Sequence, residues 1–366
     1  MEKILRTIFR VNTAVPISLG VGSLLDRQFL QEIHPDVVNL HWVCGHFISA
    51  ADVAWLAKNF KVVWTLHDSW PFTGGCHVPQ TCNKWKTGCE DCPLIGKRFG
   101  FDLAHYIFRR KAKYYAKFDF KVIGVSNWIA DCARKSFLLR DKSVFVAHNT
   151  LNQAVFKPRE QKSMRDILGL PRDKKLILFG AVNSTADANK GFDLLHAAIR
   201  QLVDKKMVGD FEIMVFGSDE PDNPPDFCTK VHYMGRFKDN LSLSILYDAA
   251  DIMIVPSRSE SFPNTVLESL NCATPVAAFR IGGIPDQIDH MVNGYLAEPY
   301  DSDDLAKGIA YKVKKERRPV VLEPMNPYER RIIHSALQSN KNVETFSEGN
   351  EPYRHVVVKP VRQKKQ

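Results

Sequence analysis

The stretch from Asp251 to Asp286, DIMIVPSRSESFPNTVLESLNCATPVAAFRIGGIPD, constrains the fold more than any other part of the chain. The short apolar run Ile252–Val255 is typical of a strand buried in a parallel sheet. Apolar side chains then recur at helical spacing from Asn264 to Leu270, and a second apolar run, Pro275–Phe279, leads into Gly-Gly. The sequence therefore predicts a strand–helix–strand unit whose loops follow the carboxyl ends of the strands, where open α/β sheets bind ligands.

Two carboxylates frame the turn of this unit. Glu260 lies in the loop, and Glu268 lies eight residues later in the predicted helix. The free backbone N–H groups at the start of that helix, around Phe262 to Thr265, favour an anion or a hydroxyl-rich ligand. Two ordinary glutamates on a helix surface are the alternative interpretation.

The whole pattern decides between these interpretations. Glu-Ser-Phe-Pro-Asn-Thr-x-x-Glu, between two apolar runs and before Gly-Gly, resembles the Glu-x₇-Glu donor site of family 4 glycosyltransferases of the polysaccharide and colanic-acid type. The resemblance extends from about His34 to Ala310. It implies that Glu260 holds the donor sugar and has a catalytic role, whereas Glu268 holds the nucleotide ribose. The other donor-binding positions that it implies are Gly217, Ser261, Phe262, Asn264 and Thr265.

Apolar runs and helical segments alternate along most of the chain, which predicts the α/β class. Strands are expected at 37–40, 62–66, 122–125, 144–147, 176–179, 212–216, 231–233, 252–255 and 275–279. The resemblance implies a GT-B-like fold with two Rossmann-like doubly wound domains. We assign residues 1–152 to an acceptor-side domain, 153–308 to a donor-binding domain and 309–366 to a small basic α+β domain. No strand is evident before Gly20, so the first domain is expected to lack its first strand.

Two further residues are candidates for the donor site. His67 follows the predicted strand Val62–Leu66, and VVWTLHDSWPFTGGC resembles the segment that carries the active-site histidine of this family. A structural histidine bonded to nearby backbone is the alternative. Lys190 precedes a predicted helix, where an ammonium group can neutralise a diphosphate leaving group. The resembled family often has an arginine earlier in this loop, and here that loop has none.

Four cysteines fall within seventeen residues: Cys76, Cys82, Cys89 and Cys92. Their spacing permits a tetrahedral thiolate site, so we predict a structural Zn²⁺, with His77 as a possible substitute for one ligand. Scattered reduced cysteines are the alternative. No metal or other cofactor is expected in catalysis itself.

The net charge of +9 is unevenly distributed. Residues 1–155 carry +8, residues 156–311 carry −6 and residues 312–366 carry +7, counting Lys and Arg against Asp and Glu. A basic first part suits an anionic membrane surface, and a solubilising surface explains it equally well. No run of apolar residues has the length of a membrane helix. We therefore expect a cytoplasmic protein, and contact with the inner face of the membrane is left open.

The last part of the chain has a different character. PVVLEPMNPYERRIIHSALQ resembles the Arg-x-x-x-His domain that ends Jag-type RNA-binding proteins, over about residues 305 to 360. That resemblance implies a basic surface for single-stranded nucleic acid, formed by Arg330, Arg331, His334 and Arg354.

Together these observations predict a retaining glycosyltransferase that uses a nucleotide-diphosphate sugar and a polysaccharide or lipid-linked acceptor. Truncation and fusion are expected to impair transfer. A nucleic-acid-binding protein with an inert transferase part is the alternative. An enzyme like glycogen phosphorylase has weaker support, because no lysine stands in a context for pyridoxal phosphate.

Overall fold

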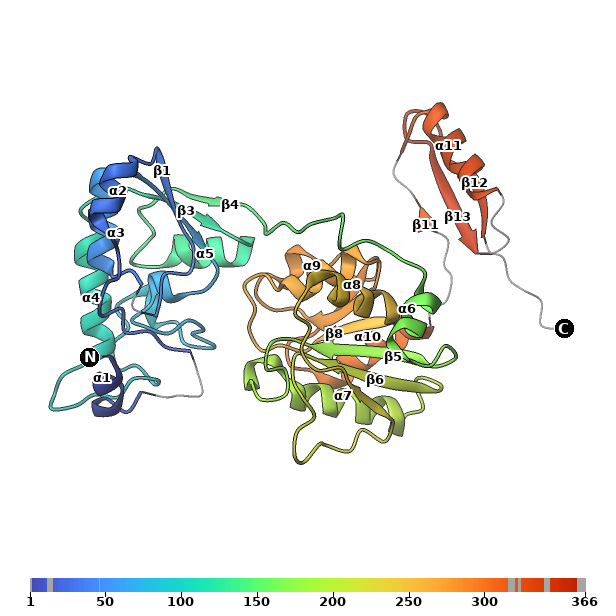
Figure 1. The fold of residues 1–366 in the computed structure, drawn as a ribbon, viewed down its shortest axis with the longest axis horizontal. Helices are drawn as coiled ribbons and strands as arrows, with labels where there is room; N and C mark the ends of the chain where they lie inside the picture. The colour runs from blue at the N-terminus through green and yellow to red at the C-terminus, as the bar shows by residue number, and fades with distance from the viewer. Residues whose placement is uncertain are drawn as a thin grey trace. The chain divides into compact units, whose positions relative to one another are not determined.

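The computed structural model describes residues 2–11, 16–45, 47–314, 320–321, 324–338 and 343–360. The chain divides into two compact units, Met1–Ile309 and Ala310–Gln366. Two parallel sheets lie in the first unit, and a small antiparallel sheet lies in the second (Figure 1).

The first sheet has four parallel strands in the order β1-β2-β3-β4. They are β1 (Val37–Leu40), β2 (Lys61–Leu66), β3 (Lys121–Gly124) and β4 (Val144–Val146). Its helices are α1 (Glu2–Ile8), α2 (Arg27–Ile33), α3 (Ala50–Asn59), α4 (Leu103–Tyr115) and α5 (Asn127–Lys135), with 3₁₀ turns at Trp70–Phe72 and Lys84–Lys86. α3 and α4 lie side by side (Figure 1). A capping box of Ser49 and Asp52 fixes the start of α3.

Aromatic side chains dominate the core of the first sheet. Trp64, Trp70 and Phe108 are almost completely buried, and the Trp64 ring meets Tyr115 edge-on at 5.8 Å between centroids. Such large side chains bury much apolar area and stabilise the loop that follows β2, which contains Trp70.

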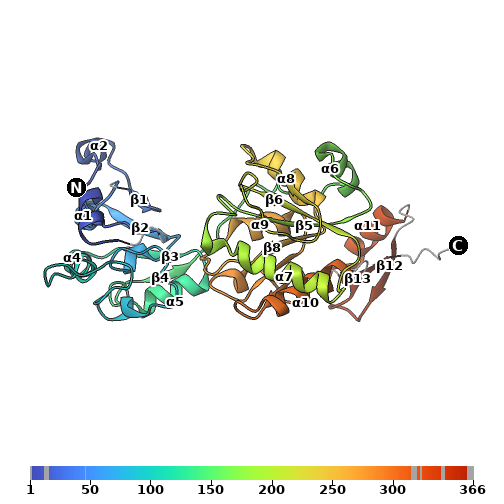
Figure 2. The ribbon, with the colours of Figure 1, turned by 90° about the horizontal axis from the view of Figure 1, so that it is seen from below.

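The second sheet has six parallel strands in the order β10-β9-β8-β5-β6-β7. They are β5 (Lys175–Gly180), β6 (Phe211–Phe216), β7 (Val231–Tyr233), β8 (Ile252–Val255), β9 (Val276–Phe279) and β10 (Gly294–Ala297). The helices are α6 (Gln161–Leu168), α7 (Phe192–Asp204), α8 (Asn240–Ala249), α9 (Asn264–Asn271) and α10 (Ser302–Lys314), with 3₁₀ turns at Ala188–Lys190 and Ile284–Asp286. α8 and α9 cover one face of the sheet, and α7 covers the other (Figures 1 and 2).

The predicted strand–helix–strand unit is β8–α9–β9. All four residues of β8 and all four of β9 are buried, which explains their continuous apolar sequence. Pro263 is the residue that precedes the first turn of α9, and no side chain caps the helix. Asn264, whose side chain suits a cap, is the first helical residue instead, so the amide groups at this end stay open to a ligand.

In the part of the second unit that the structure describes, a helix packs on a three-stranded antiparallel sheet of order β11-β13-β12. The elements are β11 (Val320–Val321), α11 (Pro327–Leu337), β12 (Val343–Glu348) and β13 (His355–Pro360). Asn326 and Glu329 form a capping box at the start of α11, and Pro327 occupies its first turn.

Among the described residues, no helix is both long and apolar enough to cross a membrane.

Candidate functional site

A cavity of about 660 Å³ in the first unit collects side chains from loops of both parallel sheets. These loops follow the carboxyl ends of strands, the expected position of a ligand site in open α/β sheets. Eight of the residues predicted for the donor site line this cavity: His67, Lys190, Glu260, Ser261, Phe262, Asn264, Thr265 and Glu268.

The loop that carries Glu260 is held against the turn after β9. The Gly283 N–H donates to the Glu260 carbonyl oxygen at 3.0 Å. A Cβ atom on Gly282 would lie 1.9 Å from that oxygen, and one on Gly283 would lie 1.8 Å from the Ser261 carbonyl oxygen. The Gly-Gly pair is therefore required because two backbone segments approach closely beside the cavity.

Lys190 and Glu260 form an ion pair in the cavity, with 2.8 Å between Nζ and Oε1. Their side chains are only 24% and 14% exposed, respectively, so solvent screens this pair weakly. A ligand that carries both a diphosphate and a sugar offers each member of the pair a new partner of its own.

Arg258 is a second cation beside the cavity, and sequence reasoning did not select it. Its guanidinium donates to the Ala188 carbonyl oxygen at 2.6 Å and pairs with both oxygens of Asp193. It comes from the loop after β8, whereas the resembled family often has an arginine in the Lys190 loop. The only signal in the sequence was its position two residues before Glu260.

His67 at the end of β2 pairs with a second histidine. His41 Nδ1 lies 2.9 Å from His67 Nε2, and the two rings are stacked. Burial lowers the pKa of His67, and the nearby His41 lowers it further. A neutral imidazole at this position suits a group that faces developing positive charge, because it adds no repulsion.

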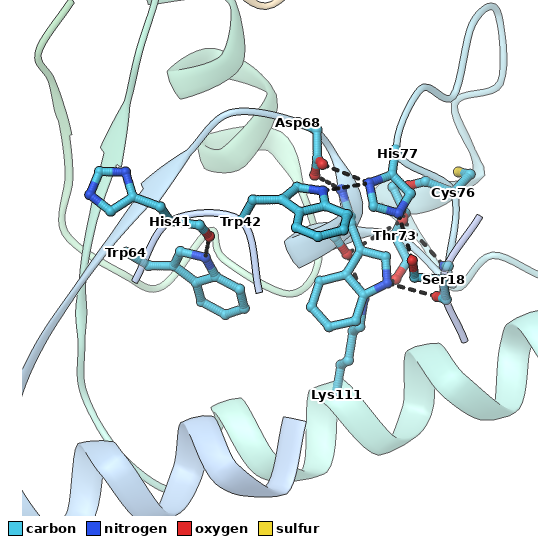
Figure 3. Close-up of polar contacts among 11 residues, drawn as sticks. Ser18, His41, Trp42, Trp64, Asp68, Thr73, Cys76, His77 and Lys111 are labelled. Carbon is cyan, nitrogen blue, oxygen red and sulfur yellow. Dashed lines mark hydrogen bonds and ion pairs between the residues drawn. The ribbon is translucent and has the colours of Figure 1, made fainter. Parts of the chain in front are cut away.

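The residue after His67 in the sequence, Asp68, belongs to a hydrogen-bonded chain with His77 and Ser18 (Figure 3). Asp68 Oδ2 lies 2.6 Å from His77 Nδ1, and His77 Nε2 lies 2.9 Å from Ser18 Oγ. In the tautomer that donates Nδ1–H to this carboxylate, Nε2 accepts the hydrogen of the serine hydroxyl. Asp68 and His77 both line the cavity.

Lys111 supports the loop that carries this chain. Its ammonium group is buried, donates to the carbonyl oxygens of Trp70 and Thr73, and lies 3.5 Å from the centre of the Trp70 ring (Figure 3). Burial lowers the pKa of Lys111 to about 7. The loop is thus fixed by a buried donor rather than by solvent contacts.

Gly217 occupies a different place from the one predicted. It does not line the cavity, although Phe216 does. Its φ is +82°, and a Cβ atom would lie 1.9 Å from the Ala181 carbonyl oxygen. Gly217 therefore allows the loops after β5 and β6 to pass each other.

The four cysteines of the predicted zinc site line one small cavity of about 20 Å³. The Gly74 N–H donates to Cys89 Sγ at 3.2 Å, and burial raises the pKa of Cys76 to about 11 and that of Cys89 to about 12. Among the described residues, no group of three or more His, Cys, Asp or Glu side chains is arranged to hold a metal ion. His77 is not part of this cavity and turns to Asp68 and Ser18, so it is no substitute ligand.

In the second unit, Arg330, Arg331, His334 and Arg354 line one open cavity of about 810 Å³. Both ring nitrogens of His334 contact hydroxyl groups of β12: Thr345 at 2.7 Å and Ser347 at 2.9 Å. Arg330 is only 8% exposed, and its guanidinium donates to the Met325 carbonyl oxygen and to Glu351, each at 2.6 Å. Arg331 and Arg354 remain exposed on the same surface.

Two family models match parts of this chain. Residues 173–314 match the family model described as glycosyl transferases group 1, and residues 303–360 match the model of the Arg-x-x-x-His (R-three-H) domain. The RNA-binding protein KhpB of Clostridium symbiosum is 66% identical over 56 residues, which are 15% of this chain and 25% of that protein. A D-inositol 3-phosphate glycosyltransferase of Streptosporangium roseum is 32% identical over 176 residues, which are 45% of this chain and 40% of that protein. The chain thus spans less than half the length of either relative.

Solved structures confirm the predicted fold class. Sucrose-phosphate synthase of Thermosynechococcus elongatus has a TM-score of 0.58 at 18% identity, with 79% of this chain and 67% of that chain covered. Alr3699/HepE of Anabaena in complex with UDP has a TM-score of 0.54 at 17% identity, with 78% and 71% covered. At these identities the likeness concerns the fold, which is GT-B. The chain therefore carries a glycosyl transferase group 1 domain over residues 173–314 and an Arg-x-x-x-His domain over residues 303–360.

Proposed function

We propose that this protein is a retaining glycosyltransferase that moves a sugar from a nucleotide-diphosphate sugar to a growing cell-surface polysaccharide or a lipid-linked acceptor. One observation supports this above all: Lys190, Glu260, Glu268 and His67 line a single cavity at the carboxyl ends of parallel strands. The complexes of Alr3699/HepE with UDP and with UDP-glucose add support, since that protein shares the fold.

In this proposal Lys190 and the open amide groups at the start of α9 neutralise the diphosphate as it leaves. The ion pair between Glu260 and Lys190 breaks, and Glu260 then accepts hydrogen bonds from hydroxyl groups of the donor sugar. Glu268 accepts hydroxyl groups of the ribose. His67, held by His41, positions the sugar beside the acceptor hydroxyl.

The transfer step forms a bond between the acceptor oxygen and the anomeric carbon while the bond from that carbon to the diphosphate oxygen breaks. Attack on the face that the leaving group vacates retains the configuration. The acceptor proton passes to a phosphate oxygen of the departing nucleoside diphosphate. No redox partner is required. The side chains that line the cavity act through their position and their charge.

Donor turnover tests this proposal. Release of nucleoside diphosphate from UDP- and GDP-sugars would be measured with a lipid extract as acceptor. Glu268→Ala is expected to lower the release rate by about 100-fold, because a buried charge-assisted hydrogen bond to the ribose is lost. Equal release by the wild type and by Glu268→Ala would overturn the assignment.

A second function is favoured by the cavity of the Arg-x-x-x-His domain. We propose that residues 312–366 bind single-stranded RNA or DNA, with contacts from the exposed guanidinium groups of Arg331 and Arg354 beside His334. The similarity to KhpB, named as an RNA-binding protein, supports this proposal. The alternative to the transferase proposal is a chain that binds RNA but transfers no sugar. A test of nucleotide binding distinguishes these two possibilities.

The place of action is also a proposal. A cytoplasmic protein that touches the inner face of an anionic membrane would meet a lipid-linked acceptor there. Arg109 and Lys113 of α4 are exposed, and the Phe99 side chain is 96% exposed. Exposed cations and an exposed aromatic ring in one segment of the chain suit a membrane interface.

We further propose that Cys76, Cys82, Cys89 and Cys92 hold one structural Zn²⁺. Four thiols around one small cavity are a donor set that zinc prefers. Burial raises the pKa values of Cys76 and Cys89, so these two free thiols are protonated at neutral pH and would release protons on binding the metal. The metal would hold together a loop of turns and short 3₁₀ segments.

Metal analysis of protein never exposed to chelator is expected to give about one Zn²⁺ per chain. Cys89→Ser should lose the metal and destabilise the first unit, whereas Cys132→Ser, outside the cavity, should keep it. A zinc content below about a tenth of an equivalent would remove the zinc site from this account.

A further inference from the structure

A tyrosine below the cavity contacts the glutamate predicted to hold the ribose. The Tyr247 hydroxyl group, in the last turn of α8, donates to Glu268 Oε2 at 2.8 Å. Tyr247 is completely buried and is not among the cavity-lining residues, whereas Glu268 is. Tyr247 thus contacts Glu268 from the interior side, where it cannot meet a ligand directly.

The position of the tyrosine ring is fixed on several sides. Its centroid lies 6.4 Å from the Phe156 ring and 5.9 Å from the Phe216 ring. The Tyr247 carbonyl oxygen accepts from Thr274 Oγ1 at 2.7 Å, which ties α8 to the end of α9. These contacts hold the Tyr247 ring in place, and its hydroxyl group meets Glu268 Oε2.

The contact with Tyr247 makes the two oxygens of the Glu268 carboxylate different. Oε2 accepts from Tyr247. No hydrogen bond to Oε1 is formed by any of the residues that the structure describes. Oε1 is thus the oxygen with capacity to accept hydroxyl groups from a ligand in the cavity.

We propose that Tyr247 is a positioning residue for nucleotide recognition: it turns Glu268 so that Oε1 accepts the ribose hydroxyl groups of a nucleoside diphosphate. This inference rests on the proposed donor site. It adds a residue outside the Glu-x₇-Glu pattern and predicts that ribose recognition, rather than diphosphate binding, depends on it.

The local electrostatics agree with this role. Burial raises the pKa of Glu268, and the hydrogen bond from Tyr247 opposes that rise. The pKa of Tyr247 lies well above its usual range because of burial, so the hydroxyl group stays a donor. Cys272 faces the pair from the end of α9, and burial raises its pKa to about 12, so it stays neutral. Behind it, the charges of Asp248 and Arg159 offset each other in an ion pair of 2.8 Å.

Tyr247→Phe in the full chain tests the inference, because it removes only the hydroxyl group. Binding of UDP, GDP and their 2′-deoxy and 3′-deoxy forms would be measured by calorimetry. The variant is expected to bind the ribonucleotide about 10-fold more weakly at pH 7.5, since one charge-assisted hydrogen bond no longer orients Glu268. The affinity for the deoxy forms should fall much less, so the variant should show a smaller preference for ribonucleotides over deoxynucleotides.

The pH dependence gives a second readout. Without the hydroxyl group the pKa of Glu268 rises further, so the affinity of Tyr247→Phe relative to the wild type should fall as the pH drops from 8 to 5.5. The ratio cancels the titration of the diphosphate itself. In a Glu268→Gln background, Tyr247→Phe should have no such pH-dependent effect.

Tyr295→Phe is the matched control. Tyr295 also donates to a carboxylate, Asp304 Oδ1 at 3.0 Å, and neither residue lines the cavity. It should bind all nucleotides like the wild type, and melting curves should show both variants folded.

The outcomes separate two failures. No nucleotide binding by the folded wild type would refute the donor site itself. In the other case the wild type binds with a preference for ribose, and Tyr247→Phe binds with the same affinity, selectivity and pH dependence. That result would overturn the role of Tyr247 alone. A uniform loss for ribo and deoxy forms would also overturn it, because that loss indicates a general structural effect.

Discussion

Lys190→Ala is expected to weaken nucleoside diphosphate binding by about 100-fold. Two costs add. The variant loses the ammonium group that would meet the diphosphate. It also leaves the Glu260 carboxylate, 2.8 Å from Lys190 Nζ in the present structure, unpaired and repelling the ligand. Calorimetric titration with UDP and GDP measures the effect.

A double substitution separates the two costs. Adding Glu260→Gln to Lys190→Ala removes the repulsion, so the double variant should bind nucleoside diphosphate more tightly than Lys190→Ala alone. Lys205→Ala is the control, because Lys205 pairs with Asp303 at 3.1 Å where both side chains are half exposed and neither lines the cavity. Equal affinity of Lys190→Ala and the wild type would place the diphosphate elsewhere.

The second large effect is expected in the Arg-x-x-x-His domain, where neighbouring arginines should behave differently. Arg330→Ala should destabilise the domain by about 2 kcal/mol, because the Met325 carbonyl oxygen and Glu351 lose a mostly buried partner. Arg331→Ala, at an exposed position, should leave stability unchanged and weaken single-stranded RNA binding. The salt dependence of its binding should fall by about one unit in the log–log slope.

Hydrogen exchange of residues 324–360 in the full chain reports the stability difference, and RNA titrations at several salt concentrations report the slope. Arg134→Ala, an exposed arginine in α5 of the first unit, is the control for both measurements. If Arg331→Ala binds RNA with an unchanged salt slope, its guanidinium makes no phosphate contact.

Most strands followed from the sequence because buried parallel strands are continuous apolar runs. β8 matches its predicted bounds, β6 begins one residue earlier than predicted, and β5 is one residue longer than predicted at each end. β10 was not predicted, since Gly-Tyr-Leu-Ala is short, contains glycine and follows polar residues. α1 and α2 were also not predicted. Neither of these seven-residue helices has a buried side chain, so their sequences show no stripe of apolar residues at helical spacing.

The candidate site was predictable where it depends on topology. Parallel strands bring their carboxyl ends to one edge, so Glu260 and Lys190, far apart in sequence, could be expected near each other. Pairwise partners were not predictable. Ser18 meets His77 across 59 positions, and Tyr247 meets Glu268 across 21, and no local pattern specifies such contacts.

The cysteine-rich loop illustrates both cases. Dense spacing predicted that the four thiols would gather, and the structure places them around one small cavity, although not at metal-binding geometry. The orientation of His77 depends on Asp68 and Ser18, which lie outside the Cys pattern. Spacing therefore indicated proximity but could not give the direction of a side chain.

The central claim is that the cavity lined by Lys190, Glu260 and Glu268 is a nucleoside diphosphate site, and calorimetric titration of the full chain with UDP and GDP tests it most directly. One molecule of at least one of the two nucleotides should bind per chain, with a dissociation constant of roughly 1 μM to 1 mM. Glu268→Ala should abolish most of that binding. A folded protein that binds neither nucleotide, or binds one equally well after Glu268→Ala, would contradict the account.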